Sequence, residues 1–322
     1  MHRRGFMMTG AAALTAPMLR AQSAGYAETA GGLDQLHALI VRQGGEEVFA
    51  EAFRGPGLDS IANIKSVSKT LVALLTGIVI DEGAIEGPEA RVLPLLGLPD
   101  RDDAINALTV GDLLSMRTGL ESTSGGNYGA WIASDNWVRA ALAQDVVAEP
   151  GGRFIYSTGG WHVLGAVLSE VTGRSLRDLA QDRLGGPLGI SFPPWARDPQ
   201  GRFLGGNEMA VTPRGLSRIG QMVLDGGQWD GDEVVPERWI ETSWERRARS
   251  PFSGDGYGYG WFLTRIESTP VRYGRGYGGQ ILAVAPEREI VIAITSDPTL
   301  PARSGGYFGA LKSLMAEVMR EV

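Results

Sequence analysis

The sequence predicts an α+β protein in which an antiparallel sheet, built from both chain ends and flanked by helices, carries a mostly helical lobe inserted in the middle. Residues 36–53 form two apolar runs split by a turn, and residues 280–295 form two more. Helical apolar patterns fill most of the stretch between them. One shared sheet is the economical arrangement for strands at both chain ends. We expect a site in the cleft between the lobes.

The terminal segments account for the predicted sheet. Gln43-Gly44-Gly45 is the turn signal within the first hairpin. Near the other end, the runs 280–285 and 290–295 form a second hairpin, and an amphipathic helix over 305–321 closes the chain. The sheet lobe is therefore expected to take residues from about 33–66 and 245–322.

The central segment, about 67–244, is predicted to form the helical lobe. Residues 66–81 are apolar almost all round, which predicts a buried helix, and Gly83 is a suitable residue to end it. Further helices are predicted at 109–117, 135–144, 161–172, 175–184 and 213–225.

Composition places the chain among ordinary globular proteins. Of its 322 residues, 43% are hydrophobic and 21% charged, the net charge is -7, and there is no cysteine. Without a basic cluster, nucleic-acid binding is not expected. The lack of cysteine excludes disulfides and thiol catalysis. His2, His37 and His162 are too scattered to suggest a metal site. We expect no metal and no cofactor.

Residues 1–24 read as an export signal. A charged start, an apolar stretch and a small-residue end are typical of secretory signals, and the Arg-Arg-Gly-Phe run favours the twin-arginine type. The apolar stretch is too short to span a membrane, and no later run reaches 18 apolar residues. We predict cleavage within 21–24 and a periplasmic or secreted domain, 25–322, without a transmembrane anchor.

Ser66 and Lys69 form the only S-x-x-K of the chain, at the start of the predicted buried helix. Their spacing puts both on one helix face, one turn apart, whereas Ser68 points to another face. Free N–H groups and the positive helix end favour an anion that develops at Ser66. A partly desolvated lysine loses its proton readily. Ser66 is the candidate nucleophile and Lys69 its base; an N-cap serine beside an exposed lysine is the structural alternative.

Tyr156 is the third candidate, in the run Tyr156-Ser157-Thr158. It lies between a glycine-rich turn and a helix start, where its side chain can project into a cleft. A phenol can relay protons near a lysine cation. Taken alone, the position fits a buried structural tyrosine better.

Together these motifs resemble the serine β-lactamase and penicillin-binding-protein superfamily, in its class C-like branch of esterases, amide hydrolases and peptidases. The resemblance implies that Ser66 is the acyl nucleophile, that Lys69 activates it and that Tyr156 shuttles the proton. It also implies an oxyanion hole formed by the N–H groups of Ser66 and Tyr277. The resemblance covers nearly all of the predicted mature domain, through residues 63–83, 113–120, 149–173, 234–241, 257–262 and 276–287.

The chain departs from the superfamily pattern in two places. Thr158 stands where the tyrosine motif usually has asparagine, and Gly274-Arg275-Gly276-Tyr277 stands where a K-T-G is usual. Arg275 could supply the missing cation. Without the lysine, recognition of a β-lactam or peptide carboxylate is in doubt, so ester or amide hydrolysis is favoured over efficient β-lactamase activity.

The remaining aromatic and polar candidates carry less information. Tyr128, Trp131 and Trp261 are expected to line the cleft, together with Thr158, Arg275 and Gly276 as substrate-binding residues. Ser134-Asp135-Asn136 spells the class A S-D-N motif, but it directly precedes a predicted helix, where Ser or Asp is the expected N-cap.

The sequence thus predicts an exported serine hydrolase that cleaves a small ester, amide or peptide through an acyl-Ser66 intermediate. One alternative is a slow-turnover penicillin-binding or sensor protein, or a D-amino-acid peptidase or β-lactamase. A second alternative is a non-catalytic cell-envelope scaffold. The sequence makes no prediction of oligomeric state.

Overall fold

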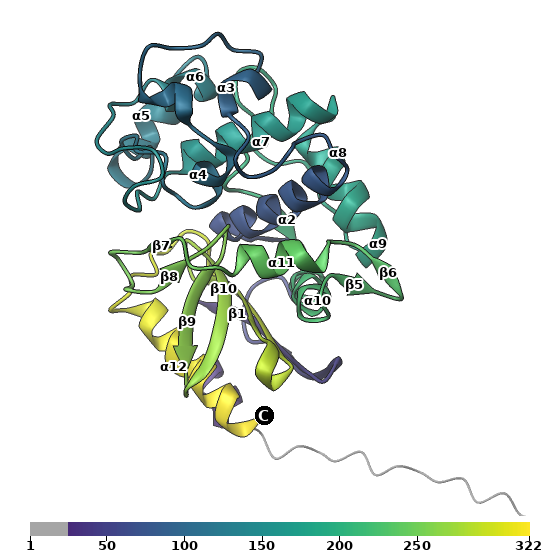
Figure 1. Cartoon of the computed structure of the whole chain (residues 1–322). Coiled ribbons are helices and arrows are strands. Elements are labelled where there is room, and N and C mark those ends of the chain that lie inside the picture. Colours follow the sequence, from purple (N-terminus) through teal and green to yellow (C-terminus); the bar gives the residue numbers. More distant parts are fainter. Residues whose placement is uncertain (1–24) are drawn as a thin grey trace, which may run out of the picture.

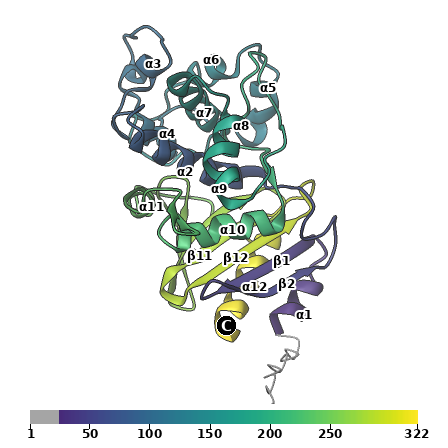
Figure 2. The ribbon, with the colours of Figure 1, turned by 90° about the vertical axis from the view of Figure 1, so that its right-hand side faces the viewer.

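The computed structural model describes residues 25–322, so the predicted export signal, 1–24, lies outside the described residues. Its main feature is an eight-stranded antiparallel sheet in the order β2-β1-β12-β11-β10-β9-β8-β7 (Figures 1 and 2). Pairing of β1 with β12 joins the two chain ends, which confirms the predicted shared sheet. The strands are β1 (Leu36–Gln43), β2 (Glu46–Ala52), β7 (Ala248–Arg249), β8 (Gly256–Tyr257), β9 (Phe262–Ile266), β10 (Thr269–Gly276), β11 (Gln280–Ala285) and β12 (Ile290–Ser296).

Both predicted hairpins are present. Gly44 and Gly45 have φ of +55° and +85°, the left-handed values that a two-residue hairpin turn requires and that glycine adopts without strain. Every residue of β11 and β12 is buried. Continuous burial follows because helices cover both faces of the sheet.

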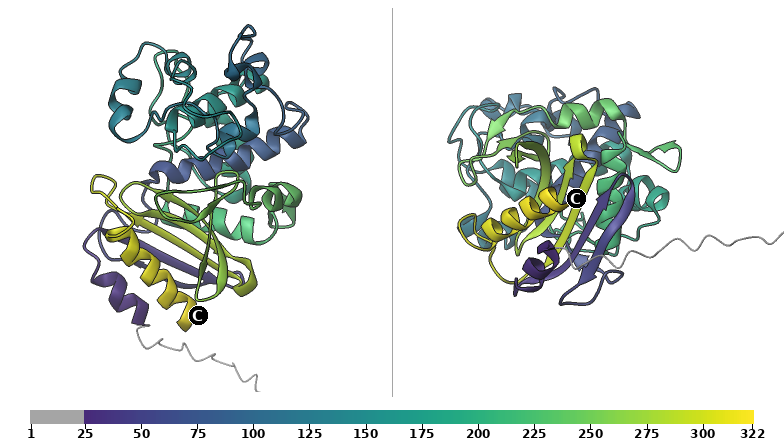
Figure 3. Two further views of the ribbon diagram at one scale, coloured as in Figure 1. Left: turned by 60° about the vertical axis from the view of Figure 1, so that its left-hand side comes forward. Right: turned by 90° about the horizontal axis from the view of Figure 1, so that it is seen from below.

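Three helices form the outer layers of the sheet lobe. α1 (Gly25–Gly31) and α12 (Tyr307–Glu321) pack together on one face (Figure 3). α10 (Pro213–Leu224) lies on the other face, against β1, β11 and β12 (Figure 2). The expected helical lobe, about 67–244, therefore extended too far. α10 packs on the sheet because Gly220 presents no side chain there: a Cβ would lie 2.4 Å from Val291 Cγ1.

The helical lobe is built around two long helices, α2 (Ser68–Asp81) and α7 (Thr158–Thr172) (Figure 1). α2 is buried along nearly its whole length, as predicted, because it lies between the lobes and contacts α7, β10 and α11 (Glu237–Ser243). α7 begins three residues earlier than predicted because the Ser157 side chain caps it, accepting from the Gly160 N–H.

Short elements complete the chain. The smaller helices are α3 (Val92–Leu95), α4 (Val110–Leu114), α5 (Tyr128–Ile132), α6 (Trp137–Leu142), α8 (Leu176–Ala180), which continues as a π-helical turn over Gln181–Gly185, and α9 (Gly186–Leu188). The smaller strand pairs are β3 (Ala62–Asn63) with β4 (Ala210–Val211), and β5 (Gln228–Trp229) with β6 (Asp232–Glu233). Within residues 25–322, no helix has the length and apolar character needed to cross a membrane.

Replacing Gly220 with alanine tests the packing of α10 on the sheet. Alanine favours helix, but its methyl group would meet Val291 Cγ1 at 2.4 Å and Leu282 Cδ1 at 2.8 Å. We expect Gly220→Ala to lower the free energy of unfolding by about 1–3 kcal/mol, measured by urea denaturation. Gly129→Ala, in α5 with nothing within 4 Å of its Cβ, is the control and should leave the stability unchanged or raise it by up to about 1 kcal/mol. Equal stability of both variants would contradict this account of α10.

Candidate active site

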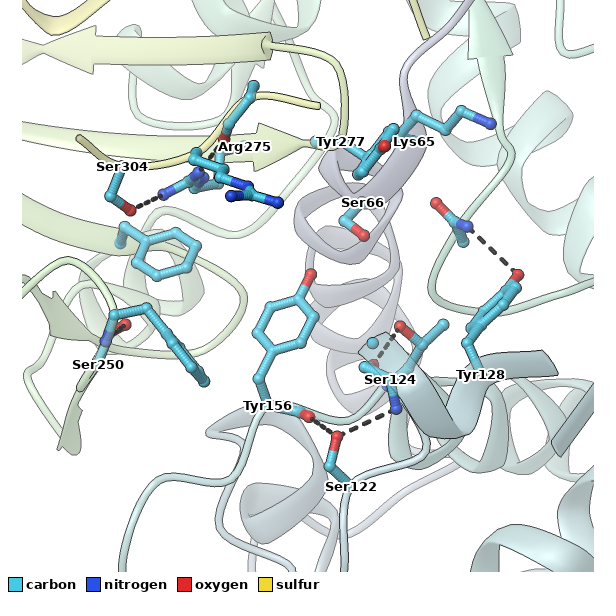
Figure 4. Close-up of a pocket in the computed structure, with 18 of the residues that line it drawn as sticks. Lys65, Ser66, Ser122, Ser124, Tyr128, Tyr156, Ser250, Arg275, Tyr277 and Ser304 are labelled. Carbon is cyan, nitrogen blue, oxygen red and sulfur yellow. Dashed lines mark hydrogen bonds between the residues drawn. The ribbon is translucent and has the colours of Figure 1, made fainter. Parts of the chain in front are cut away.

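A cavity of about 840 Å³ opens between the sheet lobe and the helical lobe, and both Ser66 and Tyr156 line it (Figure 4). Thr158, Gly276 and Tyr277 line the same cavity. The structure therefore brings together the candidate nucleophile Ser66, Tyr156 and the Gly276-Tyr277 segment, which the sequence analysis assigned to one site.

Ser66 lies in a 3-10 turn, Lys65–Val67, that leads directly into α2. Lys65 has φ of +48°, a left-handed value that is uncommon for a lysine. The turn is held from both sides: the Lys65 N–H donates to Asn63 Oδ1 at 2.8 Å, and Ser68 Oγ donates to the Lys65 carbonyl at 2.5 Å. Ser68 thus has a structural partner, while Ser66 faces the cavity.

Lys69 is buried directly beneath the serine, with 2% of its surface exposed. Its Nζ lies 3.0 Å from Ser66 Oγ, 2.5 Å from the Gly206 carbonyl oxygen and 3.3 Å from Thr158 Oγ1. Burial lowers the pKa of Lys69, although the Tyr156 phenol opposes this. No carboxylate of residues 25–322 forms an ion pair with it. A buried lysine without a counter-ion can be neutral and accept the serine proton.

Tyr156 approaches the same pair from the helical lobe. Figure 4 shows its ring directed toward Ser66. Lys69 Nζ lies 5.0 Å from the centre of that ring. The backbone is fixed by Ser122 Oγ, which donates to the Tyr156 carbonyl at 2.6 Å. This is the position expected of a group that relays protons between the lysine and a substrate.

Thr158 has a contact that the sequence analysis missed. Its Oγ1 lies 2.9 Å from Ser124 Oγ as well as 3.3 Å from Lys69 Nζ. Thr158 thus contacts Lys69, so its role is more than the absence of the asparagine amide that is usual at this position. Ser122 and Ser124, which also line the cavity, were missed because only the fold brings their loop to Tyr156.

Gly276 explains how the sheet reaches the nucleophile. A Cβ at this position would lie 2.5 Å from the Ile64 carbonyl oxygen, so only glycine lets β10 pass this close to the Ser66 turn. Tyr277 is the next residue, and its side chain is 54% exposed at the rim. Within residues 25–322, neither the Ser66 N–H nor the Tyr277 N–H donates a hydrogen bond.

Arg275 lines the cavity. The guanidinium donates to the Ala302 carbonyl at 3.0 Å and to Ser304 Oγ at 3.4 Å, and its carbon lies 3.5 Å from the centre of the Phe308 ring. These contacts hold the guanidinium against the cavity wall, and the proposal that it supplies a cation in place of the K-T-G lysine stays a prediction. Arg275 anchors the segment that forms one wall of the cavity.

Of the three aromatic residues that were expected to line the cleft, one does so and two do not. Tyr128 lines the cavity, and the Asn207 side-chain amide donates to its hydroxyl at 3.4 Å. Trp131 and Trp261 do not line the cavity: they are 3% and 0% exposed and belong to the core. Trp131 packs against Trp137, and its indole N–H donates to the Trp137 carbonyl. Both rings fill space in the core, so the expectation that they line the cleft is wrong.

The sequence analysis missed an ion pair on the cavity wall, and it correctly interpreted the S-D-N run as structural. Lys65 Nζ pairs with Glu208 Oε1 at 2.8 Å on the cavity wall, and Glu208 has φ of +70°. Nothing in the local sequence indicates that this glutamate would reach Lys65. The Ser134-Asp135-Asn136 run is structural, as expected, but the cap of α6 is Asn136, which accepts from the Arg139 N–H at 2.9 Å.

A two-lobed α+β fold with a serine, a lysine and a tyrosine gathered in its cleft is the architecture of β-lactamase-fold serine hydrolases. The chain belongs to the beta-lactamase family: the sequence model of that family matches residues 33–307. The resemblance drawn from the motifs is therefore confirmed at the level of the superfamily.

Individual relatives differ in what they act on. The chain is 25% identical over 311 residues to a 6-aminohexanoate-dimer hydrolase of Paenarthrobacter ureafaciens, covering 88% of this chain and 77% of that one. A penicillin-binding protein homologue from Caulobacter crescentus superposes with a TM-score of 0.75 at 17% identity, covering 93% and 97% of the two chains. EstCE1, a hydrolase with promiscuous acyltransferase activity, superposes with a TM-score of 0.73 at 17% identity, covering 91% and 97%.

Proposed function

We propose that the protein is a serine hydrolase that cleaves an ester or amide bond through a covalent acyl-Ser66 intermediate. The observation that carries the proposal is the 3.0 Å approach of Lys69 Nζ to Ser66 Oγ, with the lysine buried. In this arrangement a neutral amine is a base aimed at the serine hydroxyl.

The reaction follows from the positions of the groups. Lys69 takes the Ser66 proton as Oγ attacks the carbonyl carbon, and the oxyanion accepts hydrogen bonds from the N–H groups of Ser66 and Tyr277. The proton passes through the Tyr156 phenol to the leaving alcohol or amine, and the acyl–Ser66 ester remains. Water then attacks this ester, gives its proton back along the same route, and releases the acid.

Neutral esters or amides fit this site better than β-lactams. The chain has no lysine at the K-T-G position, and the Arg275 side chain there is held by the Ala302 carbonyl and the Phe308 ring. The 6-aminohexanoate-dimer hydrolase acts on a linear amide, which supports an ester or amide substrate for this chain. Penicillin binding with slow turnover is the second candidate, and the Caulobacter crescentus homologue favours it. Export to the periplasm is a separate proposal that rests on the sequence of residues 1–24.

Intact-protein mass, quenched during reaction, tests the nucleophile. With a nitrophenyl ester, we expect wild type to gain the acyl mass transiently while it turns over, and Ser66→Ala to gain nothing. A chromogenic cephalosporin run in parallel distinguishes the second candidate, for which the adduct persists. Equal labelling of wild type and Ser66→Ala would refute the assignment of Ser66. No adduct in either protein with either reagent would favour the non-catalytic scaffold.

The pH dependence of kcat/KM tests the base. Because burial lowers the pKa of Lys69, its neutral form should persist to lower pH than that of an ordinary lysine. Activity should therefore rise with pH through an apparent pKa below the ordinary lysine range and be lost as the pH falls through that value. Lys69→Met should abolish this limb together with at least about 10³-fold of the rate. A limb at the ordinary lysine value would contradict the assignment.

A further inference from the structure

The cavity has two halves of different chemistry, one on each side of Ser66 and Tyr156 (Figure 4). The half formed by the helical lobe and the 207–208 loop is rich in hydroxyl, amide and carboxylate groups. The half formed by the sheet lobe carries the apolar residues of the lining, Phe252, Phe262, Pro298 and Ala302, beside Ser250, Ser304, Arg275 and Arg303.

Two phenylalanines give the sheet-lobe half its apolar surface. Phe252 lies at the rim and is 70% exposed, so a substrate group that packs on it removes apolar surface from water. Phe262 forms the floor and is fixed by stacking on Tyr273, with ring centres 5.2 Å apart. The Arg275 guanidinium is withdrawn onto Ala302 and Phe308. Arg303 contributes the remaining charge at this wall and is exposed to solvent.

We propose that the sheet-lobe half of the cavity binds an uncharged alkyl or aryl group of the substrate. This inference rests on the proposed function and names its substrate class: an ester or amide with an apolar group on one side of the scissile carbonyl. Burial of each methylene against Phe252 and Phe262 should raise kcat/KM by about fourfold.

Two ester series test this inference and show which side of the carbonyl carries the group. One compares nitrophenyl hexanoate with nitrophenyl acetate, and the other compares hexyl acetate with ethyl acetate. Phe252→Ser should reduce the ratio of kcat/KM, long over short, by about tenfold in one series. Leu300→Ser is the matched control, because Leu300 is 43% exposed on the same wall segment but does not line the cavity. Unchanged ratios in Phe252→Ser would overturn the inference.

Two further arms keep the result unambiguous. If the mono-nitrophenyl ester of adipic acid is preferred over the hexanoate and Arg303→Gln removes that preference, the half binds an anion and the inference fails. If no ester is turned over, the proposed function fails by itself. The inference is then tested by NMR titration of Ser66→Ala with hexyl acetate and ethyl acetate: tighter binding of the longer ester supports it, and equal affinities overturn it.

A second, independent observation concerns a buried ionisable pair that the reaction does not use. His162 on α7 and the Asp198 side chain are both fully buried, and His162 Nε2 lies 3.1 Å from Asp198 Oδ2. The Gly205 N–H donates to His162 Nδ1 at 3.4 Å, so the ring proton lies on Nε2 and is donated to the carboxylate. Burial acts to raise the pKa of Asp198, but the hydrogen bonds from His162 and the Arg202 N–H hold it below its usual range.

The His162–Asp198 pair contacts Gly205, the residue next to the Gly206 carbonyl that accepts from Lys69. Gly205 and Gly206 cross α7 so closely that a Cβ on Gly205 would lie 2.4 Å from the Trp161 carbonyl oxygen, and one on Gly206 would lie 2.6 Å from Trp161 Cβ. The Gly206 carbonyl then receives Lys69 Nζ at 2.5 Å. We infer that His162, oriented by Asp198, is a positioning residue for Lys69 that acts through the Gly205-Gly206 backbone.

The chain makes a direct test possible, because Lys69 is one of only three lysines, with Lys65 and Lys312. NMR titration of the lysine Cε resonances reports Lys69 without needing turnover, and Lys69→Met assigns its signal. The groups that face the Lys69 ammonium are the Ser66 and Thr158 hydroxyls, the Gly206 carbonyl and the Tyr156 phenol. A displaced carbonyl stabilises the ammonium less, so its titration should move to lower pH.

We expect His162→Leu to lower the Lys69 midpoint by about half a pH unit. His162→Asn, whose side-chain oxygen can still accept the Gly205 N–H, should restore part of the shift and serves if the leucine variant fails to fold. Ser169→Ala is the control on the same helix, since Ser169 Oγ only donates to the Gly165 carbonyl. Wild-type Lys69 midpoints in the folded His162 variants would overturn the inference, whatever their stability.

Discussion

Burial of Lys69 between the lobes is the constraint on which the rest of the site depends. An ammonium removed from water without an anion is costly, and a protein reduces that cost by lowering the pKa of the group or by surrounding it with oxygen acceptors. Here the acceptors are Ser66, Thr158 and the Gly206 carbonyl, which come from three separate segments. The lysine is therefore solvated only when both α7 and the 205–206 loop are in place against α2, so the base and the tertiary fold are formed together.

The same constraint accounts for the glycines around the start of α2. A Cβ on Gly260 would lie 2.7 Å from Ala73 Cβ, one on Gly276 would lie 2.5 Å from the Ile64 carbonyl, and one on Gly206 would lie 2.6 Å from Trp161 Cβ. Each glycine lets a different backbone segment approach the region around the reactive serine. In the proposed mechanism, backbone groups supply the oxyanion donors, and the Gly206 carbonyl accepts from Lys69. Side chains at these glycine positions would push the backbone segments away.

Local patterns predicted the parts of this molecule that local physics determines. Apolar runs split by turn residues predicted both hairpins, and the spacing of Ser66 and Lys69 predicted their shared helix face. The sequence did not predict where α10 packs, because Gly220 is informative only once Val291 is known to lie opposite. It also misplaced Trp131 and Trp261, since a ring on a short helix or in a loop can point to a cleft or to the core, and long-range packing decides which. The Lys65–Glu208 pair joins residues 143 positions apart, beyond any local signal.

Arg275 shows why a charged residue at a familiar motif position does not define a binding function. What such a cation can bind depends on which acceptors reach it first, and here the Ala302 carbonyl and the face of Phe308 do so. An arginine has planar donors and a weakly hydrated face, so it can serve one loop carbonyl and one ring together, which a lysine ammonium does less well. The residue that stands in place of the K-T-G lysine therefore has a structural role in this chain. Because Arg275 precedes Gly276 and Tyr277, the wall segment and the proposed oxyanion donor are held by one strand. A displacement of that wall would therefore also move the proposed oxyanion donor relative to the reacting carbonyl.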